Sequence, residues 1–440
     1  MVKSYLMATI CFFNVPATGH VNPTLPLVRA LVERGDRVVY FDTPEFENKV
    51  KTTGAEFRAL ALSYDFVPRQ DTLAPFKAMG LIMEQAQRVL PYCVEQARAL
   101  QPDLILYDTM CPWGSHVAQC LEMPAVTFCS ILYIGMQNFL TWPRRTKLTR
   151  AMLTHPFYVA RGLAHYQWRA AQVWRRHRVR SPWFLDFFVN PGALTLIATS
   201  RYFQIGGERF GDKFQFIGPL IAPRADAPPV DLDWLTAKPL VYISLGTLFN
   251  DRADFFRLCV DAFRDAPYHV LIALGNRVRV QALGALPAHI RAEPYVLQLQ
   301  VLPHAAVFIT HAGMNSVSEA AWFGTPMTLA PQGGDQDFIA HRGTDDARRA
   351  LSRGQSKNRR LVSRGGRRSA RARRARRVYA KTRAELASRK YYCLRAARPI
   401  QYTHEKTDFS FRKNYVGRGA AFAHLDNRPA RVGAAARRAA

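Results

Sequence analysis

The stretch Val307–Gln336, VFITHAGMNSVSEAAWFGTPMTLAPQGGDQ, decides the fold of this chain. It opens with an apolar run rich in β-branched residues, which is typical of a buried strand. His311 and Gly313 belong to the turn that follows, and a helix is expected to begin near Asn315 or Ser316. The first N–H groups of a helix lack internal partners and point outward. A strand, a glycine turn and a helix start therefore predict an anion site suited to a diphosphate.

A second strand is expected from Pro326 to Ala330, and it leads into a polar loop that contains Asp335 and Gln336. Neighbouring parallel strands present their carboxyl ends at the same edge of a sheet, and open α/β sheets bind ligands there. The whole stretch thus predicts an α/β fold. One edge of its sheet would present N–H groups that donate hydrogen bonds to a phosphate, together with side chains that accept hydrogen bonds.

The same strand and helix pattern fills the first half of the chain. Asn22 and Pro23 suit the N-cap and first position of a helix, which predicts that a helix begins there. Apolar positions at helical spacing predict a helix from about Phe76 to Leu100. The expected strands are Thr9–Val15, Arg37–Phe41, Pro102–Asp108, Pro124–Ser130, Leu194–Thr199 and Phe214–Pro219. Strand, helix and strand in alternation imply a parallel sheet.

A second α/β pattern begins with the expected strand Leu240–Ser244, and a helix near Phe255–Phe263 and a strand at His269–Leu274 follow. Residues 221–239 hold several Pro, Ala and Asp residues and are interpreted as a linker. The predicted organisation is therefore an α/β domain over residues 1–220, a linker over residues 221–239, and a second α/β domain over residues 240–342. Residues 343–440 are predicted to be a basic tail of low order.

Charge is distributed unevenly between these parts. The net charge of the chain is +28. Residues 341–440 hold 29 Lys and Arg against 6 Asp and Glu, a net +23, and leave only +5 for the other 340 residues. Residues 353–378 contain 12 basic and no acidic residues, a composition that cannot bury enough apolar surface to fold alone. The charge therefore says little about the body of the protein.

Cysteine content and the N-terminus bear on the compartment. The seven cysteines form no C-x-x-C pair, which fits reduced thiols and a cytoplasmic protein. The apolar start, Tyr5–Phe13, resembles a signal peptide only faintly and is favoured as a buried first strand. No run approaches the roughly 20 apolar residues that a membrane span needs.

One basic and aromatic segment, residues 142–185, keeps three interpretations open. The first interpretation is a pair of solvated surface helices. The second is a wall of a substrate pocket, and the third is a helix that lies on a surface of anionic lipid.

The opening stretch also resembles the donor-binding signature of the UDP-dependent glycosyltransferases, a family that includes bacterial macrolide and plant natural-product glucosyltransferases. The matching residues are His311, Gly313, Asn315, Ser316, Glu319, Gly324, Pro326, Pro331, Asp335 and Gln336. A second element, Gly19-His20-Val21-Asn22-Pro23, is similar to the family's Gly-His-x-Asn-Pro motif. The resemblance runs from about residue 7 to about 342. It implies two Rossmann-like domains in the GT-B arrangement, over residues 1–220 and 240–342, with the second domain incomplete.

The resemblance implies a catalytic pair in the first domain. His20 is the expected general base, although its position alone favours an ordinary loop histidine. Asp108, at the end of an expected strand, corresponds to the carboxylate that holds the base, and a plain helix cap is the alternative. A carboxylate partner would hold the imidazole tautomer and stabilise the imidazolium.

The remaining matches imply a nucleotide-sugar site in the second domain. Glu319 corresponds to the ribose-binding carboxylate, and a capping box with Ser316 is the alternative. Tyr295 corresponds to the aromatic that stacks on the base, although Leu297 replaces the usual Pro of that element. Asp335 and Gln336 resemble the pair of glucose-using members. The expected donor-binding residues are Ser244, Thr247, Tyr295, Val296, Gln298, His311, Gly313, Asn315, Ser316, Glu319, Asp335 and Gln336.

These residues predict an inverting hexosyltransferase that moves a sugar, glucose as the first choice, from a UDP-sugar to a hydroxyl of a small hydrophobic acceptor such as a macrolide. The UDP-sugar is a co-substrate, and no metal or other cofactor is expected. Two alternatives stay open: a catalytically impaired UDP-sugar-binding homologue, and a protein whose polybasic tail binds nucleic acid or anionic membrane. The tail is expected to bind anions nonspecifically, without a specific nucleic-acid partner, and a frame-shifted C-terminus would account for its composition.

Overall fold

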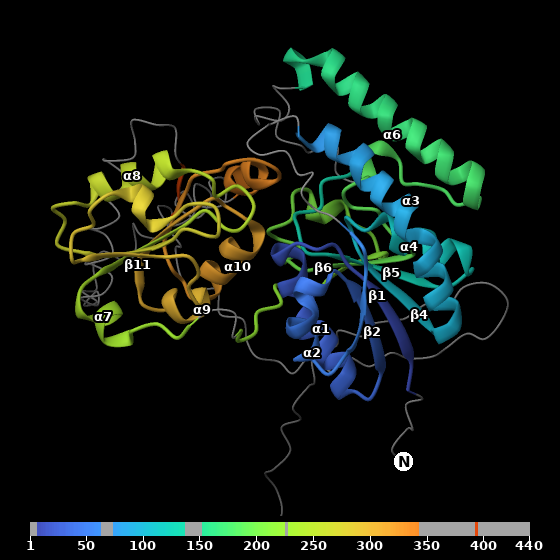
Figure 1. Cartoon of the computed structure of the whole chain (residues 1–440), viewed down its shortest axis with the longest axis horizontal. Helices are drawn as coiled ribbons and strands as arrows, with labels where there is room; N and C mark the ends of the chain where they lie inside the picture. Colours follow the sequence, from blue (N-terminus) through green and yellow to red (C-terminus); the bar gives the residue numbers. More distant parts are fainter. Residues whose placement is uncertain (1–6, 63–73, 137–151, 225–227, 343–391, 395–440) are drawn as a thin grey trace, which may run out of the picture. The chain divides into compact units, whose positions relative to one another are not determined.

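The computed structural model describes residues 7–62, 74–136, 152–224, 228–342 and 392–394. They form two α/β units, each built on its own sheet (Figure 1). The predicted α/β class with two Rossmann-like sheets is therefore confirmed. The predicted domain boundaries at 220 and 240 stay predictions.

The first sheet has seven parallel strands in the order β3-β2-β1-β4-β5-β6-β7. Their bounds are β1 Thr9–Phe13, β2 Arg37–Asp42, β3 Glu56–Ala59, β4 Leu104–Asp108, β5 Ala125–Cys129, β6 Leu194–Ile197 and β7 Phe214–Phe216. The strand order changes direction between β1 and β4, which pair directly with each other. In a sheet of this order, the loops that follow these two strands run in opposite directions and leave a crevice at the carboxyl ends of the strands. Open α/β sheets bind their ligands in this crevice.

Alternating side chains bury both faces of this sheet, as expected for a parallel sheet between helices. Ile10 and Phe12 pack in the cluster that holds apolar residues of α1, while Cys11 and Phe13 face the cluster built with α3, α4 and α6. The helices are α1 Thr18–Glu33, α2 Glu47–Lys51, α3 Ala74–Leu100, α4 Pro112–Cys120 and α6 Pro156–His177.

Helix α1 begins four residues before the predicted start at Asn22 and Pro23, so that prediction was wrong. The amides of His20 and Val21 both donate to the carbonyl of Ala17 and close the first turn upstream of Asn22. Pro23 therefore lies inside the helix and supplies no N–H to the carbonyl four residues before it, that of Gly19. This leaves one helical carbonyl oxygen in need of another partner.

Helices α3 and α6 lie side by side in the first half (Figure 1). Glycines bring them close: a Cβ on Gly162 of α6 would lie 2.8 Å from the carbonyl oxygen of Phe76 in α3. Helix α6 makes up most of the described part of the basic, aromatic segment, residues 152–185, and Phe157 and Trp168 expose 90% and 53% of their surface. Residues 142–151 of that segment lie outside the described residues, and its three interpretations remain open.

The second sheet has five parallel strands in the order β10-β9-β8-β11-β12. Their bounds are β8 Leu240–Ser244, β9 His269–Ala273, β10 Ile290–Glu293, β11 Ala305–Thr310 and β12 Met327–Leu329. The strand order of this sheet changes direction between β8 and β11. The last residues of these two strands, Ser244 and Thr310, therefore lie at a second switch point. The helices are α7 Leu232–Ala237, α8 Ala253–Ala262, α9 Gln298–Val301 and α10 Met314–Trp322.

Two segments depart from their predicted description. The linker contains the short helix α7, and the side chain of Asp231 caps it by accepting from the amide of Trp234 at 3.0 Å. Within the predicted tail, β13 Tyr392–Leu394 pairs antiparallel with β12. The rest of the tail lies outside the described residues.

None of the described helices combines the length and hydropathy that a transmembrane segment requires. The apolar start of the chain contributes β1, as expected for a buried first strand, from Thr9 onward.

Candidate functional site

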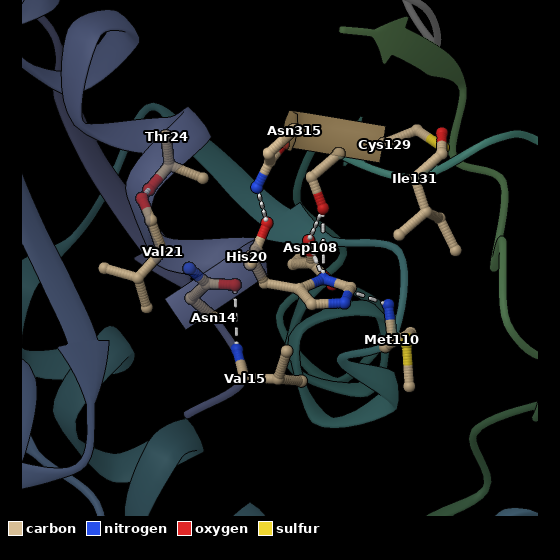
Figure 2. Close-up of polar contacts among 12 residues, drawn as sticks. Asn14, Val15, His20, Val21, Thr24, Asp108, Met110, Cys129, Ile131 and Asn315 are labelled. Carbon is tan, nitrogen blue, oxygen red and sulfur yellow. Dashed lines mark hydrogen bonds and ion pairs between the residues drawn. The ribbon is translucent and has the colours of Figure 1, made fainter. Parts of the chain in front are cut away.

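Three side chains from three elements meet at the switch point of the first sheet. His20 lies in the first turn of α1, Asp108 ends β4, and Ser130 directly follows β5. His20 Nδ1 lies 3.0 and 2.9 Å from the two carboxylate oxygens of Asp108 (Figure 2). Ser130 Oγ lies 3.1 Å from the same nitrogen. The structure thus brings together two residues that are 88 positions apart in sequence.

Asp108 is itself held in place. It is fully buried, and its Oδ1 accepts from the amide of Met110 at 2.8 Å. Ser130 Oγ donates to its Oδ2 at 3.4 Å. Because Nδ1 of His20 carries the proton shared with Asp108, Nε2 of the ring is the atom with a lone pair for an incoming proton.

The pKa of His20 reflects opposing causes. Burial lowers the pKa of His20, but the charge of Asp108 and its hydrogen bond raise it, and the charge of Asp335 raises it further. The net direction is upward from the ordinary value of 6.5. His20 is 6% exposed, so a charged imidazolium there depends on these carboxylates for its stability.

The second switch point holds His311, directly after β11. Glycines make room for its ring, because a Cβ on Gly313 would lie 2.2 Å from His311 Nε2 and one on Gly246 would lie 2.7 Å from it. Burial lowers the pKa of His311 to about 4, and a hydrogen bond with the backbone of Ser244 acts in the opposite direction. The imidazole is therefore neutral near pH 7 and acts as a neutral hydrogen-bonding group.

The start of α10 carries no side-chain cap. Ala312 adopts a left-handed conformation with φ of 68°, and Gly313 is the N-cap without a side-chain capping bond. Asn315, in the first turn, donates from Nδ2 to the carbonyl oxygen of Gly19 at 2.8 Å (Figure 2). That oxygen is the one that Pro23 leaves without a helical partner.

The capping-box alternative for Glu319 was wrong, because Gly313 is the N-cap and Ser316 lies inside α10. The carboxylate of Glu319 instead accepts from Gln298 Nε2 at 2.6 Å and from the guanidinium of Arg224 at 2.7 and 3.2 Å. Tyr242 OH donates to the other end of the Gln298 amide at 3.3 Å. The half-buried Gln298 and the buried Glu319 therefore form one connected polar group.

The other predicted donor residues divide into exposed and locally bonded groups. Tyr295 is 48% exposed, which leaves part of its ring surface accessible, and Thr247 is exposed as well. Val296 is half-buried beside it. Ser244 is buried, and its Oγ accepts from the amide of Gly246 at 3.2 Å.

The loop after β12 holds the last predicted pair. Gln336 Oε1 accepts from the amides of Gln332 and Gly333 at 2.8 and 3.2 Å, so this side chain braces its own loop. Asp335 Oδ2 is buried and, among the described residues, has no hydrogen-bond partner. Burial raises the pKa of Asp335, while the nearby charge of His20 acts in the opposite direction. An unpartnered buried oxygen is a position for a ligand hydroxyl.

Two residues of the site were not predicted. Ser130 could have been found, because it directly follows β5, the strand that pairs with β4 and its last residue Asp108. Arg224 lies in the linker and belongs to no motif, so no local pattern marks it. The described ranges also contain no group of three or more His, Cys, Asp or Glu side chains placed to hold a metal ion.

Two parallel α/β sheets, each with polar side chains at the carboxyl ends of the strands that flank its switch point, are typical of the GT-B architecture of glycosyltransferases. The family described as UDP-glucoronosyl and UDP-glucosyl transferase matches residues 202–354. NDP-glycosyltransferase YjiC of Bacillus subtilis (strain 168) is 32% identical over 341 residues, which cover 76% of this chain and 81% of that protein. The chain belongs to this family of nucleotide-sugar-dependent glycosyltransferases.

Relatives named for natural products match over a similar span. Oleandomycin glycosyltransferase of Streptomyces antibioticus is 29% identical over 343 residues, or 75% of each chain. The crystal structure of the glycotransferase of kitacinnamycin aligns with a TM-score of 0.63 at 28% identity, over 76% of this chain and 83% of that one. The calicheamicin glycosyltransferase CalG4, at 24% identity and a TM-score of 0.60 over 87% and 95% of the two chains, supports the fold alone.

Proposed function

We propose that this chain is an inverting hexosyltransferase that moves glucose from UDP-glucose to a hydroxyl of a small hydrophobic natural product. The observation that carries the proposal is the buried pair His20 and Asp108 at the first switch point, with Nδ1 of the imidazole on the carboxylate. The names of the relatives, which include macrolide-modifying enzymes, support the class of acceptor.

The reaction follows from the orientation of His20. Nε2 takes the proton of the acceptor hydroxyl while the hydroxyl oxygen attacks the anomeric carbon of the sugar. The bond from that carbon to the diphosphate oxygen breaks, UDP departs, and the configuration at carbon inverts. Asp108 stabilises the imidazolium that forms, and general-base assistance of this kind contributes about 10²–10⁴ in rate.

The second domain supplies the donor site in this proposal. The diphosphate lies at the open N-terminus of α10, where the helix dipole and free N–H groups favour negative charge. His311 and Ser316 contribute neutral hydrogen bonds there, Tyr295 stacks on the base, and Glu319 accepts a hydrogen bond from the ribose. Asp335, with its unpartnered oxygen, accepts from a sugar hydroxyl.

The test is mass spectrometry of products after incubation of the full chain with UDP-glucose and a panel of macrolide, flavonoid and lipid alcohols. We expect a hexose adduct with the parent chain and a loss of about 10²-fold or more in rate with His20→Ala. UDP affinity, measured by calorimetry, should be unchanged in that variant. UDP binding without transfer in the parent would instead favour the catalytically impaired homologue.

A further inference from the structure

The linker residue Arg224 reaches the carboxylate of α10 that the proposed function assigns to ribose. Its Nη1 donates to Glu319 Oε1 at 2.7 Å, and its Nη2 donates to Oε2 at 3.2 Å. The side chains of Arg224 and Glu319 are 20% and 3% exposed, so this two-pronged ion pair is shielded from water. Arginine is the residue that pairs with a carboxylate in this forked geometry.

Gln298 donates a third hydrogen bond to the carboxylate of Glu319. Its Nε2 donates to Oε2 of Glu319 at 2.6 Å. An ionised carboxylate offers about four acceptor positions, two on each oxygen. Arg224 and Gln298 together occupy both positions on Oε2 and one on Oε1. One acceptor position on Oε1 therefore remains for a ligand.

A ribose presents two adjacent hydroxyls, at C2′ and C3′, to such a carboxylate. A site that accepted both would reject a 2′-deoxyribose strongly, because a buried acceptor would be left without its donor. Here the guanidinium of Arg224 already fills the position that a second hydroxyl would need. The absence of the 2′-hydroxyl therefore leaves no protein group unpaired.

We propose that Arg224 restricts Glu319 to a single ribose hydroxyl, so that the chain binds 2′-deoxyribonucleotide sugars about as well as ribonucleotide sugars. The hydroxyl that binds is the 3′-hydroxyl, which both classes of donor carry. This inference rests on the proposed donor site, and it makes Arg224 a residue that determines donor specificity without contacting the reacting atoms.

Calorimetric binding of UDP and 2′-deoxy-UDP to the full chain tests the inference, because these probes differ only in the 2′-hydroxyl. We expect the two dissociation constants to agree within about threefold in the parent. In Arg224→Met the vacated position becomes available to the second hydroxyl. We expect the ratio of the two constants to rise at least tenfold there, in favour of UDP.

The controls separate the two proposals. Arg224→Gln offers a neutral donor of shorter reach and gives the same direction of change if Arg224→Met fails to fold. Glu319→Ala should weaken both ligands by similar factors and keep their ratio near one. A parent chain that already prefers UDP more than tenfold, or a ratio unchanged in the folded Arg224 variants, overturns the inference alone. A parent that binds neither nucleotide overturns the proposed function as well.

Discussion

Asp108 governs both the orientation and the charge of His20. Its two oxygens lie within 3.0 Å of Nδ1, and its negative charge raises the pKa of the imidazole against the effect of burial. The base must be neutral to accept a proton, so activity is lost as the pH falls through the pKa of His20. We expect the acid limb of kcat/KM for transfer to lie above pH 6.5, the ordinary imidazole value.

Asp108→Asn removes the charge that raises this pKa and leaves burial as the main influence. We expect the acid limb to move below pH 6.5 while kcat falls by about 10²–10⁴, because the tautomer and the imidazolium lose their support. Rates measured from pH 5 to 9 check both effects.

Ser130→Ala is the matched control, since it removes a 3.1 Å contact with the same nitrogen and a 3.4 Å hydrogen bond to Asp108 but leaves the carboxylate charge in place. Its acid limb should stay above pH 6.5. An unshifted acid limb in Asp108→Asn would contradict the role given to the carboxylate.

Helices α3 and α6 show how single glycines set the distance between elements. Gly162→Ala places a Cβ 2.8 Å from both Cβ and the carbonyl oxygen of Phe76, and the backbone oxygen cannot rotate away. Overpacking of this kind costs about 1–3 kcal/mol. We expect a lower midpoint in urea unfolding of Gly162→Ala.

Ala164→Gln on the exposed side of the same helix serves as the control. Surface substitutions by good helix formers change stability by less than about 0.5 kcal/mol. Equal midpoints for the two variants would show that α6 shifts freely on α3.

The elements that sequence predicted best are those with strong, regular apolar patterns. Strands β1, β4, β8 and β11 were all expected, because their runs of buried side chains leave few alternatives. Strand β3, EFRA, was missed because it has only four residues, two of them charged, and pairs only with β2 at the edge of the sheet. The start of α1 was misplaced because the local Asn-Pro signal competes with backbone bonds to Ala17.

The candidate site was predictable where a motif carried it. His20, Asp108, His311 and Glu319 came from a family resemblance, and the structure adds their contacts. The contact between Arg224 and Glu319 could not be foreseen, since it joins residues 95 positions apart and one of them lies in a linker without pattern. Tertiary partners of this kind depend on the folded chain rather than on local propensity.

At the scale of the whole molecule, charge and the nucleotide site are separable. Residues 395–440 hold ten basic and three acidic residues and lie beyond β13. Deletion of this segment removes a net +7, so we expect elution from heparin at lower salt. Polyanion affinity falls with salt in proportion to the number of cationic contacts. UDP affinity should stay the same, and a fall in UDP affinity on deletion would contradict this separation.

Pro23 is the position that a programme of thermostability engineering would change first. A proline inside a helix costs about 3 kcal/mol relative to alanine, and Pro23→Ala would remove that cost. The restored N–H would also compete with Asn315 for the carbonyl oxygen of Gly19, which adjoins His20. We expect a higher melting temperature together with a lower kcat and an unchanged affinity for UDP.

A thermal melt and a rate assay on the same Pro23→Ala preparation decide the matter. An increase in both stability and kcat would mean that the contact between Asn315 and Gly19 carries no catalytic benefit. A higher melting temperature together with a lower kcat would mean that the missing amide proton of Pro23 lowers the stability of α1 and at the same time supports turnover.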